Sequence, residues 1–136
     1  MRFVDANVFV YHMQEDPLYS KKTAHTIVKR IDDGEEAATS TLVIAQVCGY
    51  MKWKRRADLI PVFLTFLRSL PSLSKIHTLF SDFVEANNST RVEARGTWTK
   101  WDDFAIAAQM QRLGMKEIYS NDRHFDSIPS MRRIFQ

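Results

Sequence analysis

Residues 1–11 read MRFVDANVFVY, and this stretch decides how the rest of the chain is interpreted. An apolar run ends at Val4, Asp5 interrupts it, and apolar residues resume at 8–10. An ionised carboxylate is costly to bury unless another group pairs with it. In an open α/β sheet, ligands bind just outside the carboxyl ends of the strands. If residues 2–4 form the first strand, Asp5 lies at such an end and is a candidate ligand-binding acid.

Length and composition narrow the class of protein. The chain has 136 residues, of which 45% are hydrophobic and 26% charged, so we expect a single domain over residues 1–136. The apolar runs are shorter than the roughly 18 residues of a membrane span, and the N-terminus does not read as a secretory signal. The single cysteine, Cys48, excludes an internal disulfide framework and favours the cytoplasm. The net charge of +3 is compatible with a polyanionic partner.

The apolar pattern predicts helices that alternate with short strands. Strands are expected over residues 2–4, 37–39, 74–78, 117–120 and 131–135. Helices are expected over residues 7–13, 18–31, 41–53, 56–70, 81–95, and from 99 or 102 to 113. Asn7 is a candidate N-cap of the first helix, and Ser40 or Thr41 of the third. This alternation is typical of an α/β fold with parallel strands.

Two further acids resemble Asp5 in their placement. Asp122 follows the fourth expected strand, and Asp103 lies in the first turn of the helix before it. In a doubly wound sheet, the ends of strands one and four are neighbours. Carboxylates about 4 Å apart repel each other by about 4 kcal/mol at an effective dielectric near 20, so one is protonated or a cation lies between them. Oxygen ligands favour Mg²⁺ or Mn²⁺ over Zn²⁺, and this chemistry is that of a metal-dependent nuclease.

Four segments resemble the PIN domain, and most closely its single-domain VapC-type toxins. They are VDANVFVY from residue 4, STLVIAQV from 40, DFAIAA from 103 and IYSNDRHFD from 118. The resemblance implies a three-layer α/β/α fold with a mostly parallel central sheet. It also implies endoribonuclease activity that depends on Mg²⁺ or Mn²⁺, with a metal-activated water as the nucleophile. Members of this type usually form homodimers and are inhibited by a cognate VapB antitoxin.

The resemblance also assigns roles to individual residues. The matched positions are Asp5, Asp103 and Asp122 as metal ligands, with Asn7 and Ser120 as polar residues that brace the site. Gln46 departs from the family pattern, in which a Glu is usual. A neutral amide keeps an oxygen but removes one negative charge, so we expect Gln46 to be a weakened fourth position of the catalytic site. If this change abolishes cleavage, the domain would instead bind RNA or a protein partner.

Other polar residues are assigned less specific roles. Asp102 and Asp126 are interpreted as solvated acids, although either is close enough in sequence to compensate for the missing charge. His124 occupies a position where many relatives carry another acid. The four histidines show no ligand spacing and are interpreted as structural or surface residues, namely His12, His25, His77 and His124. A phosphorelay domain is disfavoured because Asp5 has no acidic neighbour and Asp122 no nearby Lys.

Basic and aromatic residues alternate in one short segment. They are Lys52, Trp53, Lys54, Arg55 and Arg56. Cations beside an aromatic platform are typical of single-stranded RNA binding, although a solvated helix end explains the same pattern. A second set with the same two interpretations consists of Arg91, Arg95, Trp98 and Lys100.

Overall fold

A computed structural model of the chain describes residues 1–14, 18–93 and 101–136. Within them, five short strands form one sheet: β1 (Arg2–Val4), β2 (Ala37–Ser40), β3 (Leu73–Ile76), β4 (Glu117–Tyr119) and β5 (Arg132–Ile134). The strand order is β3-β2-β1-β4-β5, and each pairing is parallel. The order reverses at β1, which pairs with β2 on one side and β4 on the other. The predicted adjacency of the first and fourth strands is therefore confirmed.

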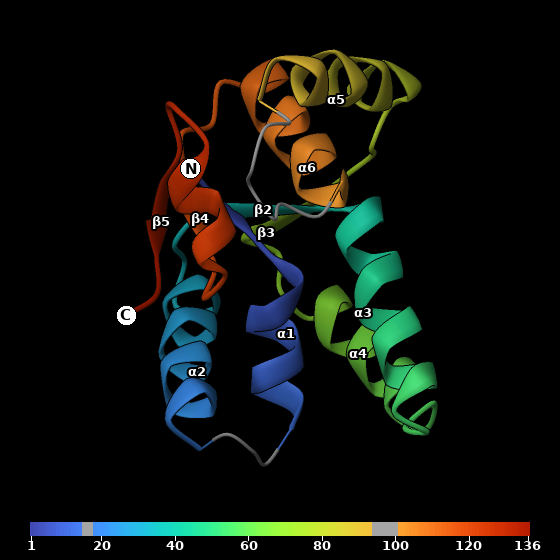
Figure 1. Ribbon diagram of the computed structural model, residues 1–136. Coiled ribbons are helices and arrows are strands. Elements are labelled where there is room, and N and C mark those ends of the chain that lie inside the picture. The colour runs from blue at the N-terminus through green and yellow to red at the C-terminus, as the bar shows by residue number, and fades with distance from the viewer. Residues whose placement is uncertain (15–17, 94–100) are drawn as a thin grey trace.

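Helices cover both faces of this sheet. They are α1 (Ala6–Met13), α2 (Leu18–Asp32), α3 (Thr41–Trp53), α4 (Leu59–Arg68), α5 (Phe80–Glu93) and α6 (Trp101–Arg112). Figure 1 shows α5 and α6 on one side of the sheet and α1 to α4 on the other. The three-layer α/β/α arrangement is thus confirmed. Among the described residues, no helix combines the length and apolarity needed to cross a membrane.

Local backbone chemistry explains where the predicted boundaries were wrong. Asp5, not Asn7, caps α1, because the Asp5 side chain accepts a hydrogen bond from the Ala6 N–H. The fourth helix begins at Leu59 and not at residue 56. Arg55 has a left-handed backbone (φ 59°), which turns the chain after α3 and delays the next helix. Ser40 caps α3 as expected.

The core holds the central strands and the start of α6 in place. The side chains of β1 and β4 that face the core are fully buried, and Ile106 and Met110 of α6 pack into the same cluster. On its other side, α6 contacts α5, where the ring of Phe83 stacks on that of Trp101 with centroids 5.8 Å apart. Asp82 of α5 is buried and accepts from Arg112 at 2.9 Å. These contacts fix the first turn of α6 relative to the ends of β1 and β4.

Candidate metal centre

Asp5 lies at the carboxyl end of β1 and is only 6% exposed. Its Oδ1 accepts from the Ala6 N–H at 2.8 Å, while Oδ2 accepts from Ser120 Oγ at 2.7 Å and from Asn7 Nδ2 at 3.2 Å. Hydrogen bonds to a carboxylate favour its ionised form and offset part of the cost of burial. The carboxylate is therefore held in one orientation by the residues around it.

Asn7 and Ser120 connect the ends of β1 and β4. Asn7 Nδ2 donates to Ser120 Oγ at 3.1 Å, and Asn7 Oδ1 accepts from the Asn121 N–H at 3.1 Å. Ser120 is fully buried, and its Oγ also accepts from the Asp122 N–H at 3.0 Å. One hydroxyl thus contacts Asp5, Asn7 and Asp122. Asn7 and Ser120 therefore both contact the Asp5 carboxylate.

Asp103, Asp122 and His124 form a compact group. Each offers a ligand atom, and these atoms lie within 4.8 Å of one another. Asp103 is 5% exposed in the first turn of α6. Asp122 caps η1, a 3₁₀ helix over Arg123–Ser127, by accepting from the His124 N–H at 3.0 Å. The strand end, the helix start and this short turn bring the three side chains together.

His124 requires a correction to the sequence interpretation. The sequence shows no ligand spacing around it, but the fold places its Nδ1 3.1 Å from Asp122 Oδ1 and 3.7 Å from Asp103 Oδ2. The turn of η1 directs the ring back over the acid that caps it. An Asp followed two residues later by a His, directly after a strand, was the signal available in the sequence. By contrast, His12 and His25 contact each other between α1 and α2, with ring centroids 4.3 Å apart.

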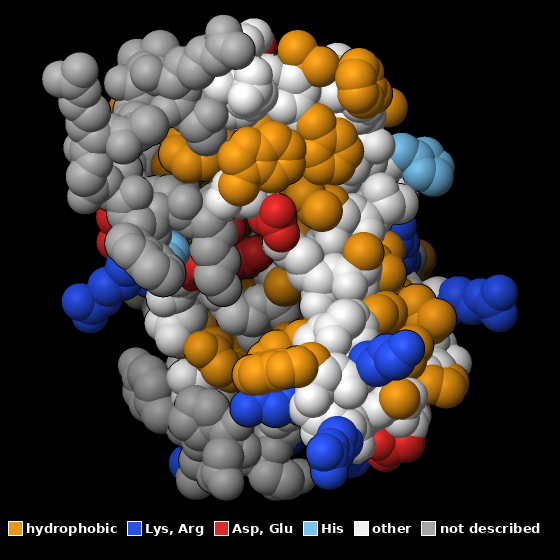
Figure 2. Space-filling view, turned by 45° about the vertical axis from the view of Figure 1, so that its right-hand side comes forward, with side chains coloured by type: hydrophobic (Ala, Val, Ile, Leu, Met, Phe, Trp, Pro, Cys, Tyr) orange, Lys and Arg blue, Asp and Glu red, His pale blue; other side chains and the backbone are white. Residues whose placement is uncertain are grey.

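The acids line a cleft of about 390 Å³. Its lining includes Asp5, Asn7, Gln46, Asp102, Asp103 and Asp122. Figure 2 shows acidic side chains at a hollow in the middle of one face, with hydrophobic side chains above and below it. Asp126 is not among the lining residues, since it is exposed and pairs with Arg133 at 2.9 Å.

Gln46 and Asp102 meet inside this cleft. Gln46 Nε2 donates to Asp102 Oδ2 at 3.1 Å. Gln46 Oε1 is buried and has no hydrogen-bond partner among the described residues. Asp102, interpreted from sequence as solvated, is half-buried and lines the cleft. That interpretation is corrected, because an amide 56 residues earlier in the chain draws the carboxylate inward.

Asp103, Asp122 and His124 are close enough together to fit one divalent cation, while Asp5 and Asp102 line the same cleft outside that compact group. Four carboxylates line one cleft, and like charges in a partly dry site repel one another unless a cation lies among them. His124 Nδ1, 3.1 Å from Asp122 Oδ1, belongs to the compact group with the two acids. Gln46 Oε1 is buried without a hydrogen-bond partner in the described part of the chain, and Gln46 lines the same cleft. Oxygen donors with one imidazole nitrogen suit Mg²⁺ or Mn²⁺.

Comparison with known proteins identifies the family of the chain. A family model described as "PIN domain" matches residues 2–130. The chain belongs to the PIN domain family. Comparison of this PIN domain with curated proteins gives no significant match.

Solved structures share the fold of this PIN domain across nearly the whole chain. VapC20 from Mycobacterium tuberculosis, a sarcin-ricin loop cleaving toxin, superposes with a TM-score of 0.79 and 14% identity, covering 93% of this chain and 94% of that one. VapBC2 from Rickettsia felis, bound to a promoter DNA fragment, gives 0.73 and 16%, covering 98% and 96%. DNA-bound VapBC from Salmonella typhimurium gives 0.69 and 13%, covering 98% and 97%. The predicted likeness to VapC-type PIN domains is confirmed at the level of the fold.

The basic segment at residues 52–56 lies beside the cleft of this PIN domain. All of its side chains are exposed, and Trp53 is 73% exposed. Lys54 Nζ lies 4.7 Å from the centroid of the Trp53 ring, which is 6.1 Å from that of Tyr50. Tyr50 itself lines the acidic cleft, so an aromatic path runs from the acids to the basic segment. The side chains of the second predicted set, residues 91, 95, 98 and 100, lie outside the described residues.

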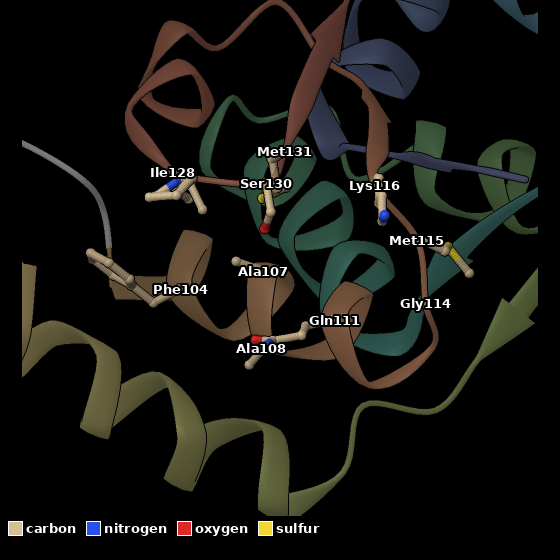
Figure 3. A pocket seen from close by; sticks show the side chains of 11 residues that line it. Phe104, Ala107, Ala108, Gln111, Gly114, Met115, Lys116, Ile128, Ser130 and Met131 are labelled. Carbon is tan, nitrogen blue, oxygen red and sulfur yellow. The ribbon is translucent and has the colours of Figure 1, made fainter.

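A second hollow of about 450 Å³ lies between α6 and the segment that leads into β5. Figure 3 shows side chains of Phe104, Ala107, Lys116 and Met131 around it. Among the described residues, those that line it include no Asp, Glu or His. Despite its larger volume, it lacks the ligands and proton-transfer groups of the acidic cleft, which is therefore the candidate centre of the chemistry.

Proposed function

We propose that this PIN domain is an endoribonuclease of the VapC toxin type that depends on Mg²⁺ or Mn²⁺. The observation that carries the proposal is the cleft at the ends of β1 and β4, which is lined by Asp5, Asp103 and Asp122. Asp5 and Asp103 are almost completely buried. Buried anions attract a cation more strongly than solvated ones do. These three acids are the proposed metal ligands, and His124 is added to them as a nitrogen ligand.

A bound divalent ion would supply an activated water and Lewis acidity at the scissile phosphate. The residues of the chain prepare the site for that chemistry. Ser120 and Asn7 hold the Asp5 carboxylate in one orientation through hydrogen bonds to Oδ2. The cap of η1 fixes Asp122, and with it the ring of His124. Because these groups are already hydrogen-bonded to the fold, little reorganisation is needed when substrate binds.

The proposed substrate is RNA with unpaired bases near the cleavage site. Tyr50 lines the cleft, the Trp53 ring lies 6.1 Å from the Tyr50 ring, and Lys54 Nζ lies over both rings. Bases stack on such rings, while nearby cations bind the phosphates. The acids of the cleft repel phosphate, so the basic segment supplies attraction that the cleft itself lacks. This arrangement supports a path for single-stranded RNA across the end of α3.

The proposal extends to the biological role. We propose a cytoplasmic toxin that forms a homodimer and is inhibited by a VapB-like antitoxin. Two solved structures with this fold are VapBC complexes. On the surface of α4, Val62 is 55% and Leu64 is 45% exposed, which supports apolar contact with another chain.

Gln46 favours a second candidate function, that of a binding module without turnover. Its neutral side chain stands where the family usually has an acid. The two candidates are separated by incubating the purified full-length chain with unstructured RNA in Mn²⁺, in Mg²⁺ and in EDTA. We expect cleavage in either metal, none in EDTA, and none by the Asp5→Asn variant. The Asp33→Asn variant is the matched control, because Asp33 is exposed and pairs with Lys29 at the end of α2.

The result that would contradict the nuclease is the absence of cleavage by the unmodified chain in both metals, together with measurable RNA binding. That outcome would support the binding module. Cleavage that persists in EDTA would contradict the metal centre. Cleavage that persists in Asp5→Asn would instead contradict the role of Asp5.

A further inference from the structure

Gln46 and Asp102, two residues that distinguish this cleft from the family pattern, are hydrogen-bonded to each other. Gln46 replaces an expected acid on α3, and Asp102 is an additional acid on α6. They lie 3.1 Å apart, with the amide N–H donating to the carboxylate. Both side chains line the same cleft. We propose that Asp102 supplies the fourth carboxylate of the metal centre and that Gln46 is its positioning residue, an inference that rests on the proposed function.

Helix geometry explains why Asp102 needs such a partner. Asp102 and Asp103 are consecutive in α6, so their side chains leave the helix about 100° apart. Asp103 is buried at 5% exposure and faces the ends of the strands. Without a further contact, Asp102 would extend toward solvent, as acids in the first turn of a helix commonly do. The Gln46 amide instead holds it at the wall of the cleft.

Charge complementarity supports the pairing. A glutamate at position 46 would place a second carboxylate against Asp102, where like charges repel strongly. The amide removes that repulsion and donates a proton to the acid. Asp5, Asp102, Asp103 and Asp122 together give the cleft four carboxylates although Gln46 is neutral.

The second polar atom of the Gln46 amide is buried. Gln46 Nε2 is occupied by Asp102, which leaves Oε1 buried without a hydrogen-bond partner in the described part of the chain. A buried polar atom without a partner is destabilising unless a ligand satisfies it. A divalent cation near Asp102 would satisfy it. The same contact that orients Asp102 therefore leaves the Gln46 oxygen available to the proposed ion or to a water bound to it.

The test is the affinity of the full-length chain for Mn²⁺, measured by isothermal titration calorimetry without RNA. We expect Asp102→Asn to weaken binding by roughly 10- to 100-fold. Asp33→Asn removes the same charge from an exposed ion pair and should leave the affinity within about twofold of the unmodified chain. Circular dichroism in EDTA checks that each variant is folded. An affinity for Asp102→Asn equal to that of the control would overturn the proposal.

A charge swap tests Gln46 as the positioning residue. In the double variant Gln46→Glu/Asp102→Asn, the new amide can donate to the new carboxylate, so the pair keeps its hydrogen bond and its total charge. We expect the double variant to bind Mn²⁺ at least about tenfold more tightly than Asp102→Asn does. A swap no better than Asp102→Asn would overturn the pairing. If the unmodified chain does not bind Mn²⁺ at all, the proposed metal centre itself fails, whereas binding that is insensitive to Asp102→Asn refutes only this inference.

Discussion

Replacing Ser120 with alanine tests whether one buried hydroxyl holds the centre together. Ser120 Oγ donates to Asp5 Oδ2 at 2.7 Å and accepts from Asn7 Nδ2 at 3.1 Å and from the Asp122 N–H at 3.0 Å. The Ser120→Ala variant loses all three hydrogen bonds at a fully buried position. The Asp5 carboxylate keeps its contacts with Asn7 and the Ala6 N–H.

The expected loss of stability depends on whether each lost hydrogen bond involves a charged group. A hydrogen bond to a charged group contributes about 1.5–3 kcal/mol, and a neutral one about 0.5–1.5 kcal/mol. Asn7 Nδ2 retains its contact with Asp5, and Asp122 is partly open to water with a side-chain exposure of 24%, so the two neutral losses are partly compensated. We expect Ser120→Ala to lower the free energy of unfolding by about 2–4 kcal/mol. At roughly 4 °C per kcal/mol for a chain of this length, Tm falls by about 10 °C.

Urea melts and thermal melts in EDTA measure this cost without any contribution from metal. Ser69→Ala is the matched control, because Ser69 is exposed and its hydroxyl donates to the Phe66 carbonyl one turn earlier in α4. Its cost should stay below about 0.5 kcal/mol. In calorimetry, Ser120→Ala should also weaken Mn²⁺ binding by roughly 10-fold or more. A stability for Ser120→Ala equal to that of Ser69→Ala would refute the bracing role.

Three other predictions concern metal choice, RNA binding and pH. Carboxylates suit Mg²⁺, whereas imidazole suits transition ions. His124→Asp should therefore raise the affinity for Mg²⁺ relative to that for Mn²⁺, as measured by calorimetry. An unchanged ratio of the two affinities would exclude His124 as a ligand. In the Asp5→Asn background, which we expect to be inactive, Trp53→Ala should weaken binding of single-stranded RNA by about 1–3 kcal/mol in fluorescence anisotropy. An equal affinity would exclude stacking on this ring. Burial and the charge of His25 lower the pKa of His12 to about 4. As the pH falls from 6.5 to 4, the unfolded chain therefore takes up this proton before the folded chain does. Because the ring is partly exposed and screened by solvent, the folded chain should lose about 1–2 kcal/mol of stability over this range. In urea melts, the free energy of unfolding of His12→Phe should fall less over this pH range than that of the unmodified chain. An equal fall would show that other groups cause it.

Local sequence signals were sufficient to predict most of the fold and the three acids. Asp5 interrupts an apolar run, and Asp122 follows another, so both could be placed at strand ends before any contact was known. The adjacency of those ends followed from the general rule for doubly wound sheets. Helix boundaries were less predictable where one backbone angle decides them, as at Arg55, whose left-handed conformation no residue pattern indicated.

The remaining site residues depend on contacts between distant segments. Asp102 and Asp103 are chemically identical neighbours in the sequence, and each is suitable for the first turn of a helix. What separates them is the packing of α6 and a hydrogen bond from Gln46, which is 56 residues away. His124 likewise reaches the acids because η1 turns tightly after Asp122. The spacing of residues in the sequence does not predict contacts of this kind.

The pairing of Gln46 with Asp102 changes how the glutamine should be interpreted. From the sequence, an amide at this position predicts a centre with one negative charge fewer. In the folded chain, the cleft still has four carboxylates, because Asp102 lines it together with Asp5, Asp103 and Asp122. A glutamate at position 46 would make five and would repel the acid that the amide now holds. The same glutamine that suggests a disabled nuclease is thus the group that allows a neighbouring carboxylate to enter the cleft, and Asp102→Asn is therefore a more decisive substitution than Gln46→Glu.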